Sequence, residues 1–276
     1  MRADKRLGQH FLTDRSILQR IVEALALAPD DVVLEIGAGK GSLTEQLLAR
    51  GLRVIAIEKD RRLAAELGER GAGSGTLRLV EGDALRVDWH ELVREPSGPA
   101  PRSPLPPFKI VGNIPYNITS PLIEKALTPP LPACIVFLVQ AELADRLAAA
   151  PGSKTYGALS VGVQAVCRVE KLFRVRAGAF TPPPRVHSAV VRLTPLAAPL
   201  VAPAEIAAFR AFVTVCFTRR RKQLRNVLLA ATHGEGVRAS AAVVAGLEAL
   251  GLDPTARPET LAPATFVRLL RWSARL

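Results

Sequence analysis

The stretch Val32-Val33-Leu34-Glu35-Ile36-Gly37-Ala38-Gly39-Lys40-Gly41 decides the fold of this chain. Its first five residues predict a buried strand, and its glycines predict a tight turn into a helix that begins near Ser42. A glycine-rich turn between a first strand and a helix is typical of nucleotide-type binding in doubly wound α/β folds. The usual dinucleotide pattern has a further glycine where this chain has Ser42. The turn therefore favours a nucleotide-like ligand other than a dinucleotide.

Two acidic residues add to this interpretation. The spacing Glu35-x-Gly37-x-Gly39-x-Gly41 is more typical of S-adenosylmethionine sites, where no pyrophosphate needs cradling. Glu58 ends the second strand about 20 residues after Gly37, where a carboxylate can accept hydrogen bonds from both ribose hydroxyls. Asp83, after the third strand, is placed to accept a hydrogen bond from the adenine amine of that cofactor. Either acid could instead cap a helix, but together they favour a methyltransferase over a dehydrogenase.

Short apolar runs alternate with helical segments along the first part of the chain. This alternation predicts an α/β fold with a parallel sheet of strand–helix–strand units. We expect further strands over Arg53–Glu58, Leu77–Val80, Phe108–Val111 and Ala133–Val139. Tyr156–Val166 and His187–Leu193 are expected as later strands, compatible with an antiparallel pair at the sheet edge. Residues 96–107 are rich in proline and predict a surface loop, to which we assign no role.

The charge and the cysteines restrict the class of protein. A formal net charge of +12 favours a polyanionic partner, nucleic acid or an anionic membrane surface, although solubility in a basic proteome is an alternative. Cys134, Cys167 and Cys216 are odd in number and far apart, so neither a disulfide framework nor a metal site is expected. No apolar leader and no run of spanning length is found, which predicts a cytoplasmic protein without membrane segments.

A rigid polar turn, Gly112-Asn113-Ile114-Pro115-Tyr116, follows the strand expected over Phe108–Val111. Pro115 fixes its own φ and pushes Ile114 toward extended geometry, which stiffens the turn. An asparagine oxygen can accept from an exocyclic amine, and a tyrosine three residues later can stack on a base. This suits chemistry on the amino group of adenine. The alternative is an Asn-Pro-type turn whose tyrosine covers the edge of the core.

Several motifs in order make the chain resemble the KsgA/RsmA family, the small-subunit ribosomal RNA adenine dimethyltransferases, over nearly its whole length. The motifs are Gly8–Leu12, Glu35–Gly41, Gly82–Ala84, Gly112–Ile118, Ser153–Val161, Phe180–Val186 and Phe217–Asn226. The resemblance implies a Rossmann-like class I S-adenosylmethionine-dependent methyltransferase domain with a small C-terminal α-helical domain. It also implies N6,N6-dimethylation of two adjacent adenosines in a hairpin of small-subunit (16S) ribosomal RNA during ribosome biogenesis.

The same resemblance implies the site residues. Contacts to S-adenosylmethionine would come from His10, Leu12, Gly37, Glu58, Asp83 and Asn113. Asn113, Tyr116 and Phe180 would form the adenine pocket, although Phe180 could also be a core aromatic before a proline turn. The family usually has asparagine where this chain has His10, so that contact could be altered or shifted to the backbone.

From about Pro203 the sequence changes to helices and turns without strand signals. We expect an S-adenosylmethionine-binding catalytic domain over 1–200 and a small helical RNA-binding domain over 201–276. A basic run is expected on a helix of the second domain, where it would suit RNA phosphates or form a solvated face. It comprises Arg219, Arg220, Arg221, Lys222 and Arg225. The implied partner is the RNA of a pre-30S particle, bound by a monomer.

Three alternatives stay open. A large-subunit adenine N6-methyltransferase of the macrolide-resistance type would share the Asn113 motif but usually lacks the stretch Arg220–Asn226. A DNA adenine methyltransferase generally has an acidic residue where this chain has Asn113. The third is a ribosome-assembly or RNA-binding factor with secondary or lost catalysis. The intact turn Gly37–Gly41, Glu58 and Asn113 argue against a loss of catalysis, but they leave open a binding role beside it.

Overall fold

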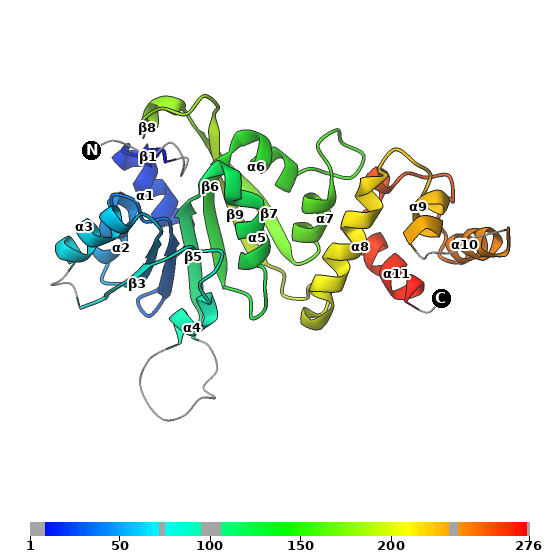
Figure 1. The fold of residues 1–276 in the computed structure, drawn as a ribbon, viewed down its shortest axis with the longest axis horizontal. Coiled ribbons are helices and arrows are strands. Elements are labelled where there is room, and N and C mark those ends of the chain that lie inside the picture. Colours follow the sequence, from blue (N-terminus) through cyan, green and yellow to red (C-terminus); the bar gives the residue numbers. More distant parts are fainter. Residues whose placement is uncertain (1–8, 72–74, 95–105, 232–236, 275–276) are drawn as a thin grey trace. The chain divides into compact units, whose positions relative to one another are not determined.

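The computed structural model describes residues 9–71, 75–94, 106–231 and 237–274 (Figure 1). The chain divides into a sheet unit, Met1–Ala144 with Val169–Pro195, and a helical unit, Asp145–Arg168 with Leu196–Leu276. The expected boundary at residue 200 lies close to the last crossing between the units, which falls between Pro195 and Leu196. Residues 145–168, which we placed with the first domain, instead group with the helical unit. The proline-rich loop lies almost entirely outside the described residues.

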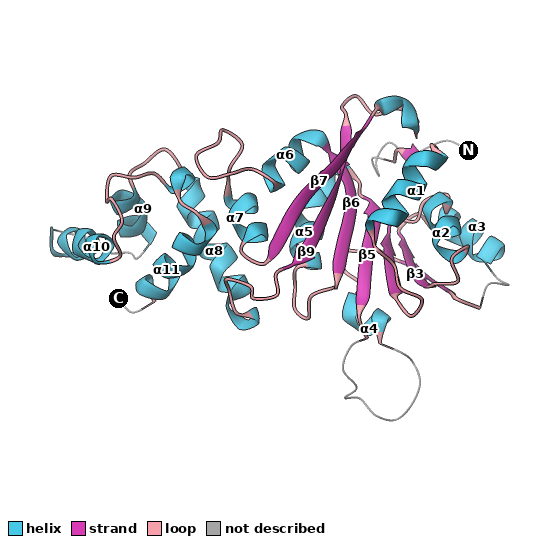
Figure 2. Ribbon diagram, turned by 180° about the vertical axis from the view of Figure 1, so that it is seen from behind, coloured by secondary structure: helices cyan, strands magenta, loops and turns pink. Residues whose placement is uncertain are grey.

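The sheet unit contains a seven-stranded sheet of order β4-β3-β2-β5-β6-β9-β7 (Figure 2). Its strands are β2 (Val32–Ile36), β3 (Arg53–Glu58), β4 (Leu77–Glu81), β5 (Phe108–Asn113), β6 (Cys134–Gln140), β7 (Cys167–Val175) and β9 (Ser188–Pro195). Neighbours from β4 through β6 pair in parallel, and β9 pairs antiparallel with β6. The predicted parallel α/β sheet is therefore confirmed, and the strand order reverses between β2 and β5, the position where such sheets bind ligands.

Helices cover both faces of this sheet, and α1 and α5 lie on opposite sides of it in the two views (Figures 1 and 2). The helices are α1 (Arg15–Ala24), α2 (Ser42–Leu48), α3 (Arg61–Gly71), α4 (Trp89–Val93), α5 (Thr119–Ala126) and α6 (Ala141–Leu147), which crosses into the helical unit. Because the central strands are covered on both faces, all five residues of β2 are buried.

Close packing of β5 against β2 requires a glycine at position 112. Gly112 pairs with Ile36, and a Cβ on Gly112 would lie 2.5 Å from the Ile36 carbonyl oxygen. No side chain fits at that distance. The register brings the ends of the two strands side by side, so the glycine turn after β2 and Asn113 at the end of β5 face the same edge of the sheet.

A small second sheet joins distant parts of the sheet unit. Strand β1 (Phe11–Leu12) pairs antiparallel with β8 (Phe180–Thr181), with Leu12 opposite Phe180. The Thr13 amide extends the contact by donating to the Ala179 carbonyl oxygen at 2.9 Å. The segment before α1 is thereby held against the loop that follows β7.

The helical unit contains α7 (Ala158–Gln164), α8 (Ile206–Thr218), α9 (Leu224–Ala231), α10 (Val237–Ala249) and α11 (Pro263–Ser273). Helix α8 contacts α7, α9 and α11. The strand expected over 156–166 is wrong, because α7 occupies 158–164 and the strand begins at Cys167. A short apolar run does not by itself distinguish a buried helix from a buried strand. No helix in the described part of the chain is long and apolar enough to cross a membrane.

The basic run also differs from its expected structure. Helix α8 ends at Thr218, and α9 begins only at Leu224, so Arg219–Lys222 lie in a turn and Arg225 alone lies on a helix. The Lys222 amide donates to the Arg219 carbonyl oxygen within this turn, and the Leu224 amide donates to the Ala256 carbonyl oxygen. These bonds stop the helix from continuing through the arginines.

Candidate functional site

A pocket lies at the carboxyl ends of the parallel strands, where ligands bind in such sheets. It gathers residues from the segment before α1, the turn after β2, the end of β3, the loop after β4 and the end of β5. The predicted site residues in its lining are His10, Gly37, Glu58, Asp83, Asn113 and Tyr116. Residues that are far apart in the sequence are therefore brought into one site.

The glycine turn and Glu58 form one hydrogen-bonded unit. Gly37, Gly39 and Gly41 all have positive φ, a conformation that residues with side chains rarely adopt. This conformation directs the Gly39 amide to Glu58 Oε2 at 2.7 Å, and the Asp60 amide donates to Glu58 Oε1 at 2.7 Å. Burial raises the pKa of Glu58, while the two amides oppose that shift. Each carboxylate oxygen is fixed by one donor and retains capacity to accept another.

A buried acid behind the glycine turn was not singled out as a contact by the sequence. Glu35 is almost fully buried, and its Oε2 accepts a hydrogen bond of 2.6 Å from Thr44 Oγ1 on α2. Burial raises the pKa of Glu35 to about 7. The bond joins β2 to α2 across the turn. The first position of the Glu-x-Gly spacing was its only sequence signal.

Asp83 follows β4, which is separated in the sheet by β3 from β2 and its glycine turn. Its Oδ2 accepts from Lys59 Nζ at 2.9 Å, and its Oδ1 accepts from the Leu85 amide at 3.0 Å. The Lys59 contact is the main cause of the lowered pKa of Asp83. The carboxylate is therefore an acceptor at neutral pH. Lys59 follows Glu58 directly, but nothing in the sequence indicated that it would pair with Asp83.

Asn113 is oriented by the chain that precedes α1. Its Nδ2 donates to the backbone carbonyl oxygen of His10 at 2.7 Å. The imidazole of His10 makes two other contacts: Nδ1 donates to the Pro182 carbonyl oxygen at 2.8 Å, and the ring stacks on Tyr116 with centroids 5.8 Å apart. The contact between positions 10 and 113 thus runs through the backbone of His10. The expected contact of His10 with S-adenosylmethionine stays a prediction.

Tyr116 is held at its hydroxyl end. Its phenolic oxygen lies 2.7 Å from Ser188 Oγ, at the start of β9. Burial raises the pKa of the half-buried Tyr116, so the ring stays neutral. Ser188 is fully buried and was not predicted as a functional residue. It was visible in the sequence only as the second residue of an expected strand.

Leu12 and Phe180 are the predicted cofactor-binding and adenine-binding residues that lie outside the pocket lining. Both belong to the hydrophobic core, and neither lines the pocket. Phe180 is 3% exposed, so stacking of a base on its ring would need a local movement of the β1–β8 pair. Their predicted roles in ligand binding stay predictions. No cluster of three or more potential metal ligands occurs among the described residues.

Comparison with known proteins gives a consistent picture. The family described as "Ribosomal RNA adenine dimethylase" matches residues 1–257. The chain is 43% identical to "Ribosomal RNA small subunit methyltransferase A" of Pseudomonas fluorescens, over 97% of this chain and 93% of that protein. It is 44% identical to the protein of the same name from Gloeobacter violaceus, over 96% and 91% of the two chains.

Two solved structures resemble the whole chain. A dimethyladenosine transferase from Plasmodium falciparum matches with a TM-score of 0.78 and 30% identity, over 94% of this chain and 96% of that one. The 23S rRNA methyltransferase ErmE matches with a TM-score of 0.69 and 30% identity, over 96% and 99%. The expected class I methyltransferase fold with a C-terminal helical region is confirmed. On the family match and these identities over nearly its full length, the chain belongs to the ribosomal RNA adenine dimethylase family.

Proposed function

We propose that the protein transfers methyl groups from S-adenosylmethionine to N6 of two adjacent adenosines in a hairpin of small-subunit ribosomal RNA. The observation that carries the proposal is the fixed side-chain amide of Asn113. Its nitrogen is committed to the His10 carbonyl oxygen, which leaves Oδ1 to accept a hydrogen bond inside the pocket. An acceptor there suits the exocyclic amine of adenine.

The residues that line the pocket suit S-adenosylmethionine by their acceptors, their apolar side chains and their glycines. Gly37 and Gly39 have no side chains, so a ligand can approach their backbone. Glu58 can accept from ribose hydroxyls through the free lone pairs of its two oxygens, and Asp83 can accept from an adenine amine. Ile36 and Ile57 supply apolar lining. We assign the cofactor contacts to these residues and to His10 and Asn113.

S-adenosylmethionine supplies a methyl group bonded to a sulfonium. The lone pair of adenine N6 is delocalised into its ring, so this amine is a poor nucleophile. Hydrogen bonds from N6 to Asn113 Oδ1 and to a backbone carbonyl oxygen would orient the amine and favour a pyramidal nitrogen. The Pro115 carbonyl oxygen already accepts from the Ile118 amide and from Thr119 Oγ1. We therefore assign the second acceptor to Ile114.

Tyr116 offers its ring to the target base, which must leave its helix to enter the pocket. Stacking and two hydrogen bonds would align N6 with the methyl group, and such alignment supplies about 7–11 kcal/mol in well-oriented reactions. No general base is needed, because the methylated ammonium is acidic enough to lose its proton to water. Phe180 completes the base clamp only if the β1–β8 pair moves.

The choice of small-subunit RNA rests on the names of the relatives at 43% and 44% identity. The likeness to a 23S rRNA methyltransferase, at 30% identity, keeps the large subunit as a second candidate. We further propose that the substrate is a pre-30S particle, that the protein acts as a monomer and that it is cytoplasmic, since subunit assembly takes place there in bacteria.

Transfer of tritiated methyl groups to unmethylated small and large subunits, followed by nucleoside analysis, tests the proposal. We expect label in the small subunit as N6,N6-dimethyladenosine, and none with Asn113→Ala. Label in the large subunit would move the activity to the second candidate. Subunit binding without label in either subunit would leave an assembly factor in place of a methyltransferase.

A further inference from the structure

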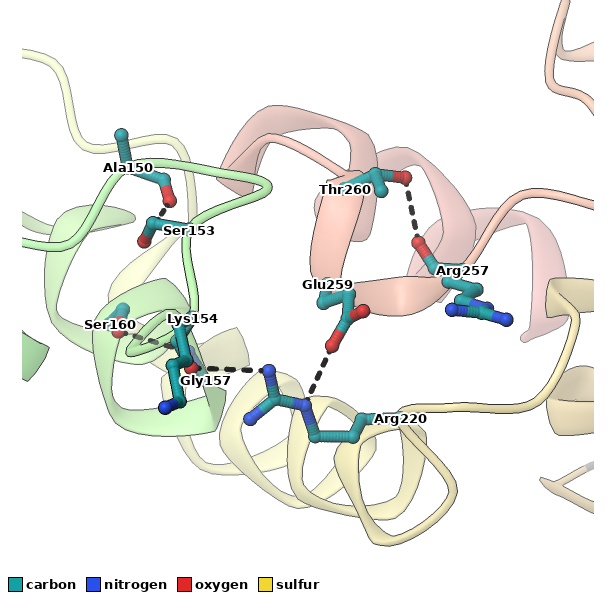
Figure 3. Close-up of polar contacts among 9 residues, drawn as sticks. All are labelled: Ala150, Ser153, Lys154, Gly157, Ser160, Arg220, Arg257, Glu259 and Thr260. Carbon is teal, nitrogen blue, oxygen red and sulfur yellow. Dashed lines mark hydrogen bonds and ion pairs between the residues drawn. The ribbon is translucent and has the colours of Figure 1, made fainter.

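Arg220 differs from the other basic residues of the turn between α8 and α9. Its Nε donates to Glu259 Oε2 at 2.7 Å, and a terminal nitrogen donates to the Lys154 carbonyl oxygen at 3.3 Å (Figure 3). Arg220 is half-buried, whereas Arg219 and Arg221 are exposed. Its guanidinium is engaged in contacts within the helical unit. A direct phosphate contact would have to compete with them.

The two partners of Arg220 belong to segments that are distant in sequence. Glu259 lies in a short 3₁₀ turn, η5 (Pro258–Thr260), and its carbonyl oxygen accepts from the Gly152 amide at 2.7 Å. Lys154 lies in the loop 150–157, which is anchored by the buried Tyr156 through a hydrogen bond of 2.8 Å to the Leu261 carbonyl oxygen. Arg220 thus ties the basic turn to two other segments.

Exposed cations lie in the basic turn, in the loop 150–157 and directly before the 3₁₀ turn. They are Lys154, Arg219, Arg221, Lys222 and Arg257, which we call the junction cations. In Figure 3, Lys154 and Arg257 flank the pair formed by Arg220 and Glu259. Within the described ranges, no ion pair holds any of the five side chains.

Two acids, Glu259 and Asp253, interact with arginines that are not junction cations. Glu259 is paired with Arg220. Asp253 has a lowered pKa, mainly through hydrogen bonds with Thr255, and the charge of Arg225 contributes. Arg225, the one basic residue of the run on a helix, is therefore partly balanced. The junction cations keep their charge available to a polyanion.

We propose that the junction cations bind the phosphate backbone of ribosomal RNA and that Arg220 is a positioning residue which holds their three segments together. The proposal rests on the RNA partner of the proposed function. It adds Lys154 and Arg257 to the surface predicted from the basic run and removes Arg220 from direct contact. A surface held in place before binding spends less free energy on ordering its side chains.

The variant Glu259→Ala distinguishes the proposed positioning role of Arg220 from RNA binding by charge attraction alone. The substitution removes a negative charge beside the junction cations, so attraction alone predicts tighter RNA binding. Loss of the Arg220 anchor predicts weaker binding, by about 2- to 12-fold for each side chain that must be ordered anew. Arg220→Lys keeps the charge but loses the forked geometry, and we expect it to weaken binding in the same way.

The measurement is the affinity of the full-length variants for unmethylated small ribosomal subunits over a series of salt concentrations. Arg221→Gln and Lys154→Gln should each weaken binding and lower the salt slope by about 1. Glu259→Ala and Arg220→Lys should weaken binding with the slope retained. Calorimetric affinity for S-adenosylmethionine should be unchanged in all four variants, since their changes lie in the helical unit.

Tighter or unchanged binding by Glu259→Ala would overturn the proposal, as would full affinity of Arg220→Lys, which would make position 220 an ordinary phosphate contact. If Glu259→Ala fails to fold, Arg220→Lys decides alone. Methyl transfer by the unaltered protein is measured separately. If the unaltered protein transfers no methyl groups but the RNA affinities of the variants change as expected, the proposed function is refuted and the proposed RNA-binding surface is supported.

Discussion

The side-chain nitrogen of Asn113 donates to the backbone carbonyl oxygen of His10 at 2.7 Å. With its nitrogen bound in this way, the side-chain amide of Asn113, a residue of the pocket lining, keeps its oxygen available as an acceptor. Because the acceptor is a backbone atom, every residue at position 10 can supply it. The side chain of His10 acts instead through its stacking on Tyr116 and its hydrogen bond to Pro182.

Asn113→Asp should lower kcat for methyl transfer by about 10²-fold, the cost of misplacing a reacting group. The aspartate keeps the acceptor oxygen, but its second oxygen would replace the nitrogen that donates to the His10 carbonyl oxygen. Two acceptors would then face each other, so the side chain would turn away. Steady-state kinetics on small subunits would measure the effect. As a comparison, His10→Ala keeps the backbone acceptor but loses one ring pair and the exposed hydrogen bond to Pro182, so a loss of about tenfold is expected. Equal losses at the two positions would contradict this division of roles.

Tyr116→Phe and Ser188→Ala should impair methyl transfer to the same extent, each by about tenfold at most, because both delete the bond between the two hydroxyls. The double variant should be no worse than either single one. This double-mutant cycle is tested by measuring kcat/KM for small subunits in the unaltered protein and the three variants. Losses that multiply in the double variant would mean that the two residues act independently.

Glu58→Gln should weaken the binding of S-adenosylmethionine by about 10- to 100-fold, measured by calorimetry. A glutamine has one acceptor oxygen, so it cannot satisfy both the Gly39 and Asp60 amides that now donate to the two carboxylate oxygens. Glu45→Gln is a matched control, since Glu45 is an exposed acid on α2 that pairs with Arg70 outside the pocket. Retained affinity in Glu58→Gln would remove Glu58 from the cofactor contacts.

Glu35→Gln should change how stability depends on pH. The pKa of Glu35 is about 7 in the folded protein, against an ordinary value of 4.5, so the folded state binds this proton more tightly. Its contribution to stability is fully present below about pH 4.5 and is lost as the pH rises through 7. A glutamine can still accept from Thr44 without ionising. The melting temperature of Glu35→Gln relative to the unaltered protein should therefore increase between pH 5 and pH 8, and a constant difference would contradict the assignment.

Much of the sheet and half of the site could be predicted because both follow from strand ends. Buried parallel strands appear in the sequence as short apolar runs, and their carboxyl ends meet at one edge. A polar residue at the carboxyl end of such a run or within two residues of it, such as Glu58, Asp83 or Asn113, is then expected near the same pocket. The motif spacing alone was enough to place these three side chains together.

What could not be predicted depends on partners that are distant in sequence. The run around Ser160 forms a helix because α8 and α11 bury it, and apolar content alone does not distinguish that outcome from a strand. The arginines after Thr218 lie in a turn because backbone bonds to Ala256 and Pro254 hold the start of α9 in place. Ser188 became a functional candidate only when β9 was placed beside Tyr116.

The helical unit is built from two stretches of chain, with strands of the sheet unit between them. Truncation will therefore be a poor way to separate catalysis from RNA binding. A fragment that ends at residue 195 would retain the loop of Tyr156 but lose Phe217 and Leu261, which cover it. Exposed apolar surface of that kind promotes aggregation. Dissection of this enzyme should rely on surface substitutions in the intact chain.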